Sequence, residues 1–163
     1  MEAVIPRLRR YARALTGDRS AADDLVQDTL ERAWTKFHLW RRGSDLRAWL
    51  FTIMHNVHVN QLRARRSAFA SALEDEDIDP PVRATQTDML EVRDIDSSLQ
   101  RLPVEQREVL LLVALERMSY QETASALGIP IGTVMSRLSR ARERLRVLLQ
   151  GEAPPAAGLK VVK

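Results

Sequence analysis

The chain has 163 residues, of which 45% are hydrophobic and 29% are charged, a composition that suits one modest core or two small ones. It contains no cysteine, which excludes disulfides, zinc fingers and thiol nucleophiles, and its three histidines cannot supply a His/Cys metal cluster. No run of apolar residues approaches the roughly 18 that span a bilayer. We therefore expect a cytoplasmic protein that uses no cofactor and no metal.

The net charge of +3 is distributed unevenly along the chain. Residues 1–67 carry 13 basic and 7 acidic side chains, residues 68–96 carry 2 and 9, and residues 97–150 carry 8 and 5. Nearly all the basic residues are arginine, which suits bidentate contact with phosphate and guanine. Two basic blocks on either side of an acidic one fit a nucleic-acid partner, although a charge run alone more often marks a solvated face.

Glycine is scarce, and apolar residues recur at helical spacing through both basic blocks, which predicts an all-α fold. Between the blocks, an acidic run at residues 74–77 precedes two prolines that remove amide donors and disfavour helix. We expect two small helical domains joined by a flexible acidic linker. The expected division is a first domain at 1–67, the linker at 68–93, a second domain at 94–150 and a disordered tail at 151–163.

The first block should contain a helix that ends near Thr16 and Gly17, because glycine accepts the left-handed position after a helix. We expect the next helix to begin at Ser20, with Asp23 completing a variant of the capping box. One side of this helix is apolar and packs inward. The other side carries polar residues at positions i, i+3, i+4 and i+7, which leaves it free to bind a partner. These polar residues are Asp24, Gln27, Asp28 and Glu31.

A third helix should begin after Gly43-Ser44-Asp45 and run out into Arg65 and Arg66, with its apolar residues inward. Its outer side carries Arg47, Thr52, Asn56, Asn60 and Arg63.

The aromatic residues and histidines of the first block have more ordinary interpretations than a binding role. We expect Trp34, Phe37 and Trp49 in the core rather than as platforms for stacked bases, because they follow helical spacing. We expect His55 and His58 to be partly exposed polar residues rather than ligands or pH sensors.

The most specific local pattern lies in the second block, which reads YQETASALGIPIGTVMSRLSRARERL from Tyr120. Ala124, Gly128 and Val134 occupy its fifth, ninth and fifteenth positions. Two helices that cross steeply need a small residue where they touch, a glycine at the turn and an apolar residue to dock the second helix. The spacing predicts a helix-turn-helix, and the arginines of the second helix favour DNA binding over an ordinary αα-hairpin.

The second helix of this motif should present its N-terminal turn to base edges and nearby phosphates. The candidate contacts are Thr133, Met135, Ser136, Arg137 and Arg140. Upstream, a helix that starts at Pro103 should build the core beneath the motif.

Three stretches together resemble the extracytoplasmic-function sigma factors, the minimal branch of the major bacterial sigma family. They are DRSAADDLVQDTLERAW, DLRAWLFTIMHNVHVNQLRARR and LQRLPVEQREVLLLVALERMSYQETASALGIPIGTVMSRLSRARERLR. They cover most of residues 7–149 in the family's order. The resemblance implies a specificity subunit of RNA polymerase whose partners are core polymerase, promoter DNA and an anti-sigma factor.

The resemblance also implies a role for each surface. The second helix looks like the one that docks on the clamp coiled coil of the polymerase largest subunit, through Asp24, Gln27, Asp28 and Glu31. The third helix looks like the segment that recognises and helps to melt the minus-ten element, through Asn56, Asn60, Arg63, Arg65 and Arg66. The helix-turn-helix would read the minus-thirty-five element.

Two other functions stay open at this point. An operator-binding dimer with a helix-turn-helix would bind DNA without polymerase, and a sigma mimic would titrate an anti-sigma factor with little promoter opening. We do not expect an enzyme, because no set of nucleophile, base and orienting residue is visible and no glycine-rich phosphate loop occurs. The linker is long enough to permit a contact between the domains that buries their DNA-binding faces.

Overall fold

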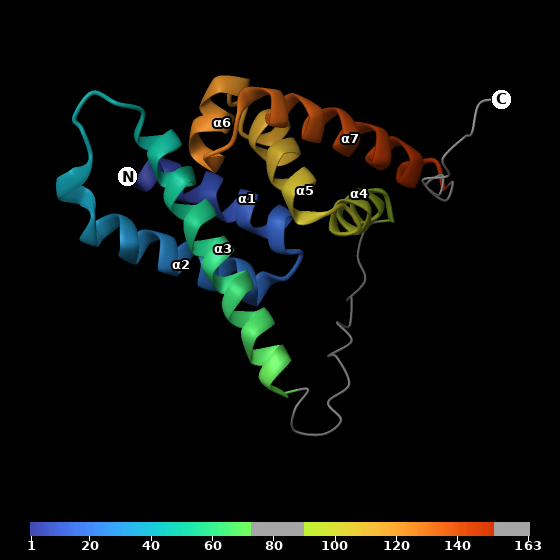
Figure 1. Cartoon of the computed structure of the whole chain (residues 1–163), viewed down its shortest axis with the longest axis horizontal. Helices are drawn as coiled ribbons and strands as arrows, with labels where there is room; N and C mark the ends of the chain where they lie inside the picture. Colours follow the sequence, from blue (N-terminus) through green and yellow to red (C-terminus); the bar gives the residue numbers. More distant parts are fainter. Residues whose placement is uncertain (73–89, 152–163) are drawn as a thin grey trace.

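The computed structural model describes residues 1–72 and 90–151, which contain helices and no strand (Figure 1). The N-terminal helices are α1 (Ile5–Thr16), α2 (Arg19–Thr35) and α3 (Leu46–Ala72), with 3-10 turns at Glu2–Val4 and Phe37–Leu39. The C-terminal helices are α4 (Leu90–Gln100), α5 (Val104–Leu110), α6 (Tyr120–Leu127) and α7 (Ile131–Leu149), with a π-helical turn at Leu111–Leu115. The predicted all-α fold is confirmed.

The expected linker and tail fall mostly outside the described residues. At the two ends of the expected linker, α3 extends to Ala72 and α4 begins at Leu90, so both ends are helical. The helical pattern of the first block therefore continues past the expected boundary at residue 67.

The turn between α1 and α2 combines a confirmed prediction with a correction. Gly17 ends α1 in the left-handed region at φ +70°, as predicted, and its amide donates to the Arg13 carbonyl. The predicted start of the next helix at Ser20 is wrong. Asp18 caps α2, because its Oδ2 accepts from the Ala21 amide at 2.9 Å, and Ser20 lies inside the first turn.

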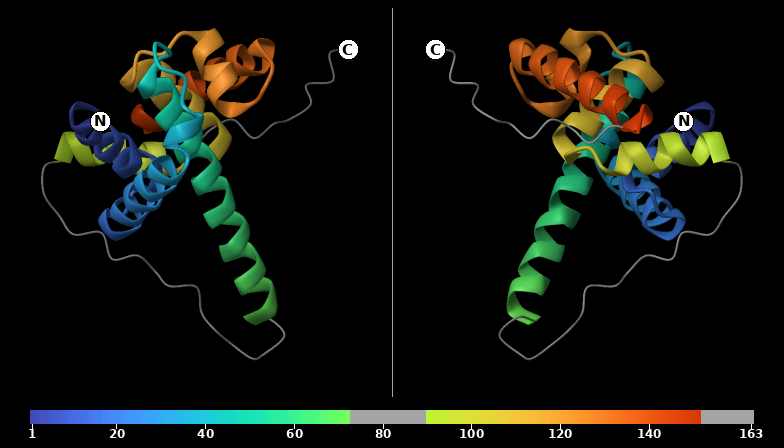
Figure 2. Two further views of the ribbon diagram at one scale, coloured as in Figure 1. Left: turned by 90° about the vertical axis from the view of Figure 1, so that its left-hand side faces the viewer. Right: turned by 90° about the vertical axis from the view of Figure 1, so that its right-hand side faces the viewer.

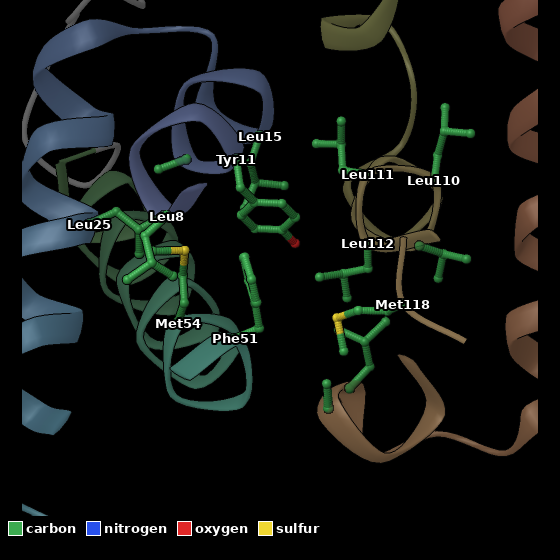
Figure 3. Packing of buried hydrophobic residues seen from close by; sticks show 14 of the residues in the cluster. Leu8, Tyr11, Leu15, Leu25, Phe51, Met54, Leu110, Leu111, Leu112 and Met118 are labelled. Carbon is green, nitrogen blue, oxygen red and sulfur yellow. The ribbon is translucent and has the colours of Figure 1, made fainter. Parts of the chain in front are cut away.

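The N-terminal and C-terminal helices share one continuous hydrophobic core. Figure 3 shows Tyr11 and Phe51 lying opposite Leu112 and Met118, with the Tyr11 hydroxyl directed toward the C-terminal helices. The Tyr11 and Phe51 rings meet edge to face, with their centroids 5.0 Å apart. We call the contact surface between the N-terminal and C-terminal helices the seam.

The second half of α3 is the main departure from this compact packing. It projects away from the other helices in every view, and residues 63–71 are all exposed (Figures 1 and 2). The helix thus carries an arginine-rich segment out from the core, where a large partner can reach it.

Two expectations about the first block are wrong. The Trp34 side chain is 76% exposed, and Phe37 is also exposed and stacks on Trp40, with the ring centroids 5.5 Å apart. Only Trp49 packs against the core, and it is partly buried. His58 is buried rather than partly exposed, because α3 turns that side toward α5.

Candidate polymerase and nucleic-acid interfaces

Helix α2 separates a buried side from an exposed polar side, as its sequence predicts. The buried residues are Ala21, Ala22, Leu25, Val26, Thr29 and Ala33. The four polar residues are all exposed, and we call Asp24, Gln27, Asp28 and Glu31 the α2 stripe. Within the stripe, the Gln27 side chain donates to Glu31 Oε1 at 3.4 Å. An exposed acidic surface on a rigid helix suits a cationic partner.

The α2 stripe continues onto α3 through one side-chain contact. The Gln61 amide donates to Asp28 Oδ2 at 2.7 Å, which joins the two helices across an open groove of about 720 Å³. Asp28 and Glu31 line this groove from α2, and Asn60 lines it from α3. The structure therefore brings part of the candidate polymerase surface beside part of the candidate minus-ten surface, which sequence spacing alone did not indicate.

The five candidate minus-ten residues are all exposed, but they do not share one face. At about 100° per residue, Asn56, Asn60 and Arg63 fall within one narrow sector of α3. Arg66 lies farther around the helix, and Arg65 lies on the side opposite Asn56. Asn56, Asn60 and Arg63 can therefore contact one partner surface together, whereas Arg65 faces a different direction.

The helix-turn-helix has the geometry that its sequence predicts. Ala124 is 5% exposed and Val134 is fully buried between the two helices, while Gly128 takes the left-handed turn at φ +65°. A capping box starts α6, because Ser119 Oγ accepts from the Glu122 amide and the Glu122 carboxylate accepts from the Ser119 amide. The pattern S-x-x-E in the sequence could have found this cap.

The candidate recognition residues on α7 divide by exposure. Met135, Ser136 and Arg140 are exposed, whereas Thr133 and Arg137 are half-buried. The Ser136 hydroxyl donates back to the Thr133 carbonyl at 3.1 Å, so it is not aimed outward in this state. Arg137 lines a groove of about 290 Å³ at the seam, and Arg63 and Arg66 line the same groove.

Across residues 1–72 and 90–151, no three His, Cys, Asp or Glu side chains are placed to hold a metal ion. Among the helices of those residues, none combines the length and apolar character that crossing a membrane requires.

Comparison with known protein families finds two matches along the chain. The family model described as the Sigma2 domain of PhyR matches residues 1–55, and the one described as Sigma-70, region 4 matches residues 93–145. The first match covers α1, α2 and the start of α3, and the second covers the helix-turn-helix and the helices beneath it.

Individual relatives extend the similarity over most of the chain. The ECF RNA polymerase sigma factor EcfG of Rhodopseudomonas palustris strain TIE-1 is 40% identical over 153 residues, which are 90% of this chain and 81% of the relative. Among solved structures, the sigma factor RpoE of Bartonella quintana, in complex with the anti-sigma factor NepR, is 37% identical. It superposes with a TM-score of 0.78 over 93% of this chain and 94% of RpoE.

A second solved structure is CnrH in complex with the cytosolic domain of CnrY. It is 31% identical, with a TM-score of 0.64 over 90% of this chain and 82% of CnrH. Each of these matches covers at least 90% of this chain, so the similarity extends over both its N-terminal and its C-terminal helices. The chain belongs to the extracytoplasmic-function RNA polymerase sigma factors.

Proposed function

We propose that this sigma factor binds core RNA polymerase through the α2 stripe and reads its promoter with α3 and α7. The observation that carries the proposal is the stripe itself: four polar residues, all exposed, on a helix whose other side is buried. Asp28 and Glu31 share a groove with Asn60, so polymerase and the minus-ten strand would meet along one continuous surface. The protein would catalyse nothing itself and would direct the polymerase's chemistry.

Run-off transcription with purified core polymerase tests the polymerase contact. In Asp24→Arg/Asp28→Arg we expect loss of promoter-specific transcripts and of polymerase binding, because two carboxylates become like charges toward a cationic partner. The matched control is Asp94→Arg/Asp96→Arg, which reverses two exposed charges on α4 and should transcribe like the parent protein. Equal transcription by the α2 variant and the control would refute the polymerase role of the stripe.

The DNA contacts would follow the two exposed helical surfaces. Asn56, Asn60 and Arg63 would face the non-template strand of the minus-ten element, and Arg65 and Arg66 would contact phosphates nearby. Thr133, Met135, Ser136, Arg137 and Arg140 would read the minus-thirty-five element in the major groove. Footprinting of the promoter complex with Arg140→Ala should show lost protection at the upstream element alone.

An anti-sigma factor is a proposed third partner. The support is that RpoE and CnrH, both similar to this chain, were solved in complexes with NepR and CnrY. If the chain forms one helical domain at about 1–67 and another at about 94–150, joined by a linker, such a partner could bind both domains. A polymerase subunit that reads chromosomal promoters acts in the cytoplasm, and we propose that location.

The two alternative functions predict different results in the same transcription assay. An operator-binding regulator would bind duplex DNA tightly and ignore core polymerase. A sigma mimic would bind an anti-sigma factor but support no transcripts. The identity to sigma factors over both halves of the chain favours neither alternative.

A further inference from the structure

Glu116 is a fully buried carboxylate at the seam, directly after the π-helical turn. Its Oε2 lies 3.0 Å from Nε of Arg7, and its Oε1 lies 3.5 Å from Nη2 of Arg10. Both arginines belong to α1, so the ion pairs connect the N-terminal and C-terminal helices. A carboxylate withdrawn from water needs such partners, because removing them leaves an uncompensated buried charge.

The main chain of Glu116 is held from the same side. Its carbonyl oxygen accepts from Nη1 of Arg47 at 2.9 Å and from Nη2 of Arg7 at 3.3 Å. The next residue, Arg117, has φ +54°, a region that is costly for a residue with a side chain. A strained turn thus presents Glu116 to three arginines of the N-terminal helices. We call Arg7, Arg10, Arg47 and Glu116 the arginine clasp.

A second buried carboxylate crosses the seam nearby. Glu108 on α5 is 4% exposed, and its Oε1 lies 2.8 Å from Nδ1 of His55 and 3.9 Å from Nδ1 of His58, both on α3. Tyr11 lies close to both carboxylates. Burial raises the pKa of the Tyr11 hydroxyl well above its usual value, and the charges of Glu108 and Glu116 raise it further.

A third set of contacts closes the end of α1. Gln100 donates to the Ala14 carbonyl at 2.9 Å, and Arg107 donates to the Leu15 carbonyl at 2.6 Å. These carbonyls have no acceptor role inside α1, because the last turn of a helix leaves its carbonyls unpaired. The C-terminal helices therefore satisfy polar groups that the N-terminal helices cannot satisfy alone.

The seam places two proposed DNA surfaces in one groove. Arg63 and Arg66 from α3 line the same groove as Arg137 from α7. The positions in their names place the minus-ten and minus-thirty-five elements about 25 base pairs apart, which is about 85 Å along a duplex at about 3.4 Å per base pair. A protein closed at the seam cannot place these arginines on both elements at once, so promoter reading requires the halves to separate.

We propose that the arginine clasp on Glu116 holds the free sigma factor in a closed, autoinhibited arrangement that must open before both promoter elements are read. Opening would return Arg7, Arg10 and Arg47 to solvent or to a partner, and would expose Glu116. A partner that supplies replacement charges for these groups would stabilise the open state. The inhibitory role of the arginine clasp rests on the proposed DNA contacts. The role of the clasp in holding the seam closed does not depend on them.

The absence of native cysteine makes the closed state directly measurable. Spin labels at Ser20→Cys on α2 and Ser139→Cys on α7, both exposed, report the distance between the halves by pulsed electron resonance. We expect one narrow distance distribution in the otherwise unchanged 163-residue chain. In Arg7→Glu/Arg10→Glu we expect a longer, broader distribution, with the open-to-closed ratio raised at least about tenfold, because a buried carboxylate then faces like charges.

Two further variants distinguish opening of the seam from misfolding and from a general effect of changed charge. Arg9→Glu/Arg13→Glu makes the same charge change at two exposed positions of α1 and should keep the narrow distribution. Glu116→Gln removes the charge with little change of shape and should also open the seam. If Arg7→Glu/Arg10→Glu and Glu116→Gln both fold and both keep the distance distribution of the parent protein, the arginine clasp does not hold the seam closed.

Transcription by the same proteins separates the clasp from the proposed function. We expect Arg7→Glu/Arg10→Glu to reach half-maximal run-off transcription at a several-fold lower sigma concentration than the parent protein. Opening with unchanged or higher half-maximal concentration would overturn the autoinhibitory role. Opening without any promoter-specific transcript, from the parent protein or the variant, would overturn the proposed function and leave the clasp intact.

Discussion

The seam and the outer side of α2 are both rich in carboxylates, but the two regions place them in opposite environments. At the seam, Glu116 and Glu108 are 0% and 4% exposed, and each meets cationic or histidine partners from the N-terminal helices. On α2, Asp24 and Glu31 are exposed, and among the described residues no ion pair reaches the α2 stripe.

This difference separates residues that hold the molecule together from residues that are free to bind. Removing one partner of a buried ion pair destabilises the fold, because the other partner is left in the interior without a counter-charge. An exposed carboxylate contributes little to the free energy of folding, so it can interact with a partner molecule at little cost to stability. Unfolding measurements on matched variants can therefore test whether the two regions differ in this way.

The largest loss of stability should come from Glu116→Ala. The substitution removes a fully buried charge and leaves Arg7 and Arg10 without their counter-charge, while the main-chain carbonyl of residue 116 can still accept from Arg47. We expect the free energy of unfolding in urea to fall by about 3 kcal/mol, the lower end for a broken buried pair, because two of the arginines can turn to solvent. A loss as small as that of a surface substitution would show that the seam does not depend on this charge.

A smaller loss should follow from Gly17→Ala. Gly17 has φ +70°, and an added Cβ would collide with the side-chain Cδ of Gln100, which must then move from the Ala14 carbonyl. Strain at a left-handed position costs about 1–3 kcal/mol, and the lost contact adds to it. Gly128→Ala is the matched control, because it has φ +65° with nothing within 4 Å of the added atom. Equal losses in the two variants would mean that Gln100 contributes nothing at the seam.

Local patterns predicted most of the elements on both sides of this comparison. Period 3.6 located the helices, Gly17 and Gly128 marked their turns, and the i, i+3, i+4, i+7 spacing located the α2 stripe. The spacing of Ala124, Gly128 and Val134 predicted the helix-turn-helix, because that motif is a local packing problem. The family resemblance then assigned roles to these surfaces, and those residue-level roles remain predictions.

The seam could not be predicted from such patterns. Glu116 meets arginines more than 100 positions earlier in the chain, and nothing in its neighbouring residues encodes that pairing. The sequence suggested a partly exposed His58, but the residue is buried. Its burial depends on Glu108 of α5, which lies in the other half of the chain. Trp34 departs in the opposite direction, because it follows the apolar spacing of α2 but lies exposed in the last turn of that helix.

The pH dependence of folding should report Glu108. Burial alone would raise the pKa of this carboxyl, but the hydrogen bond with His55, the proximity of His58 and their charges lower it below the ordinary value of 4.5. Because the folded pKa is depressed, this contribution to stability is complete above about pH 4.5 and is lost as the pH falls through the folded pKa. The charged and titratable groups nearby are Tyr11, His55, His58, Arg63, Arg66, Glu105, Arg107 and Arg137.

Glu108→Gln tests this assignment by urea unfolding between pH 7 and pH 3.5. The variant should be about 1–2 kcal/mol less stable than the parent protein at pH 7, and the difference should shrink as the pH falls below 4.5. The exposed Asp94→Asn is the control, and its difference from the parent protein should stay small throughout. If the free energy of unfolding of Glu108→Gln depends on pH as strongly as that of the parent protein, the titration belongs to other groups.

The smallest effect on folding should come from Asp24→Ala/Asp28→Ala on the α2 stripe. Asp24 is exposed, and Asp28 has one exposed contact, its 2.7 Å hydrogen bond from Gln61, so the free energy of unfolding should stay within about 0.5 kcal/mol of the parent value. The same variant should bind core polymerase more weakly and give fewer transcripts, because truncation removes two charges from the proposed interface. Together these results would place the two carboxylates in binding alone. A stability loss as large as that of Glu116→Ala would instead make the α2 stripe part of the folding core, and the contrast between the two regions would fail.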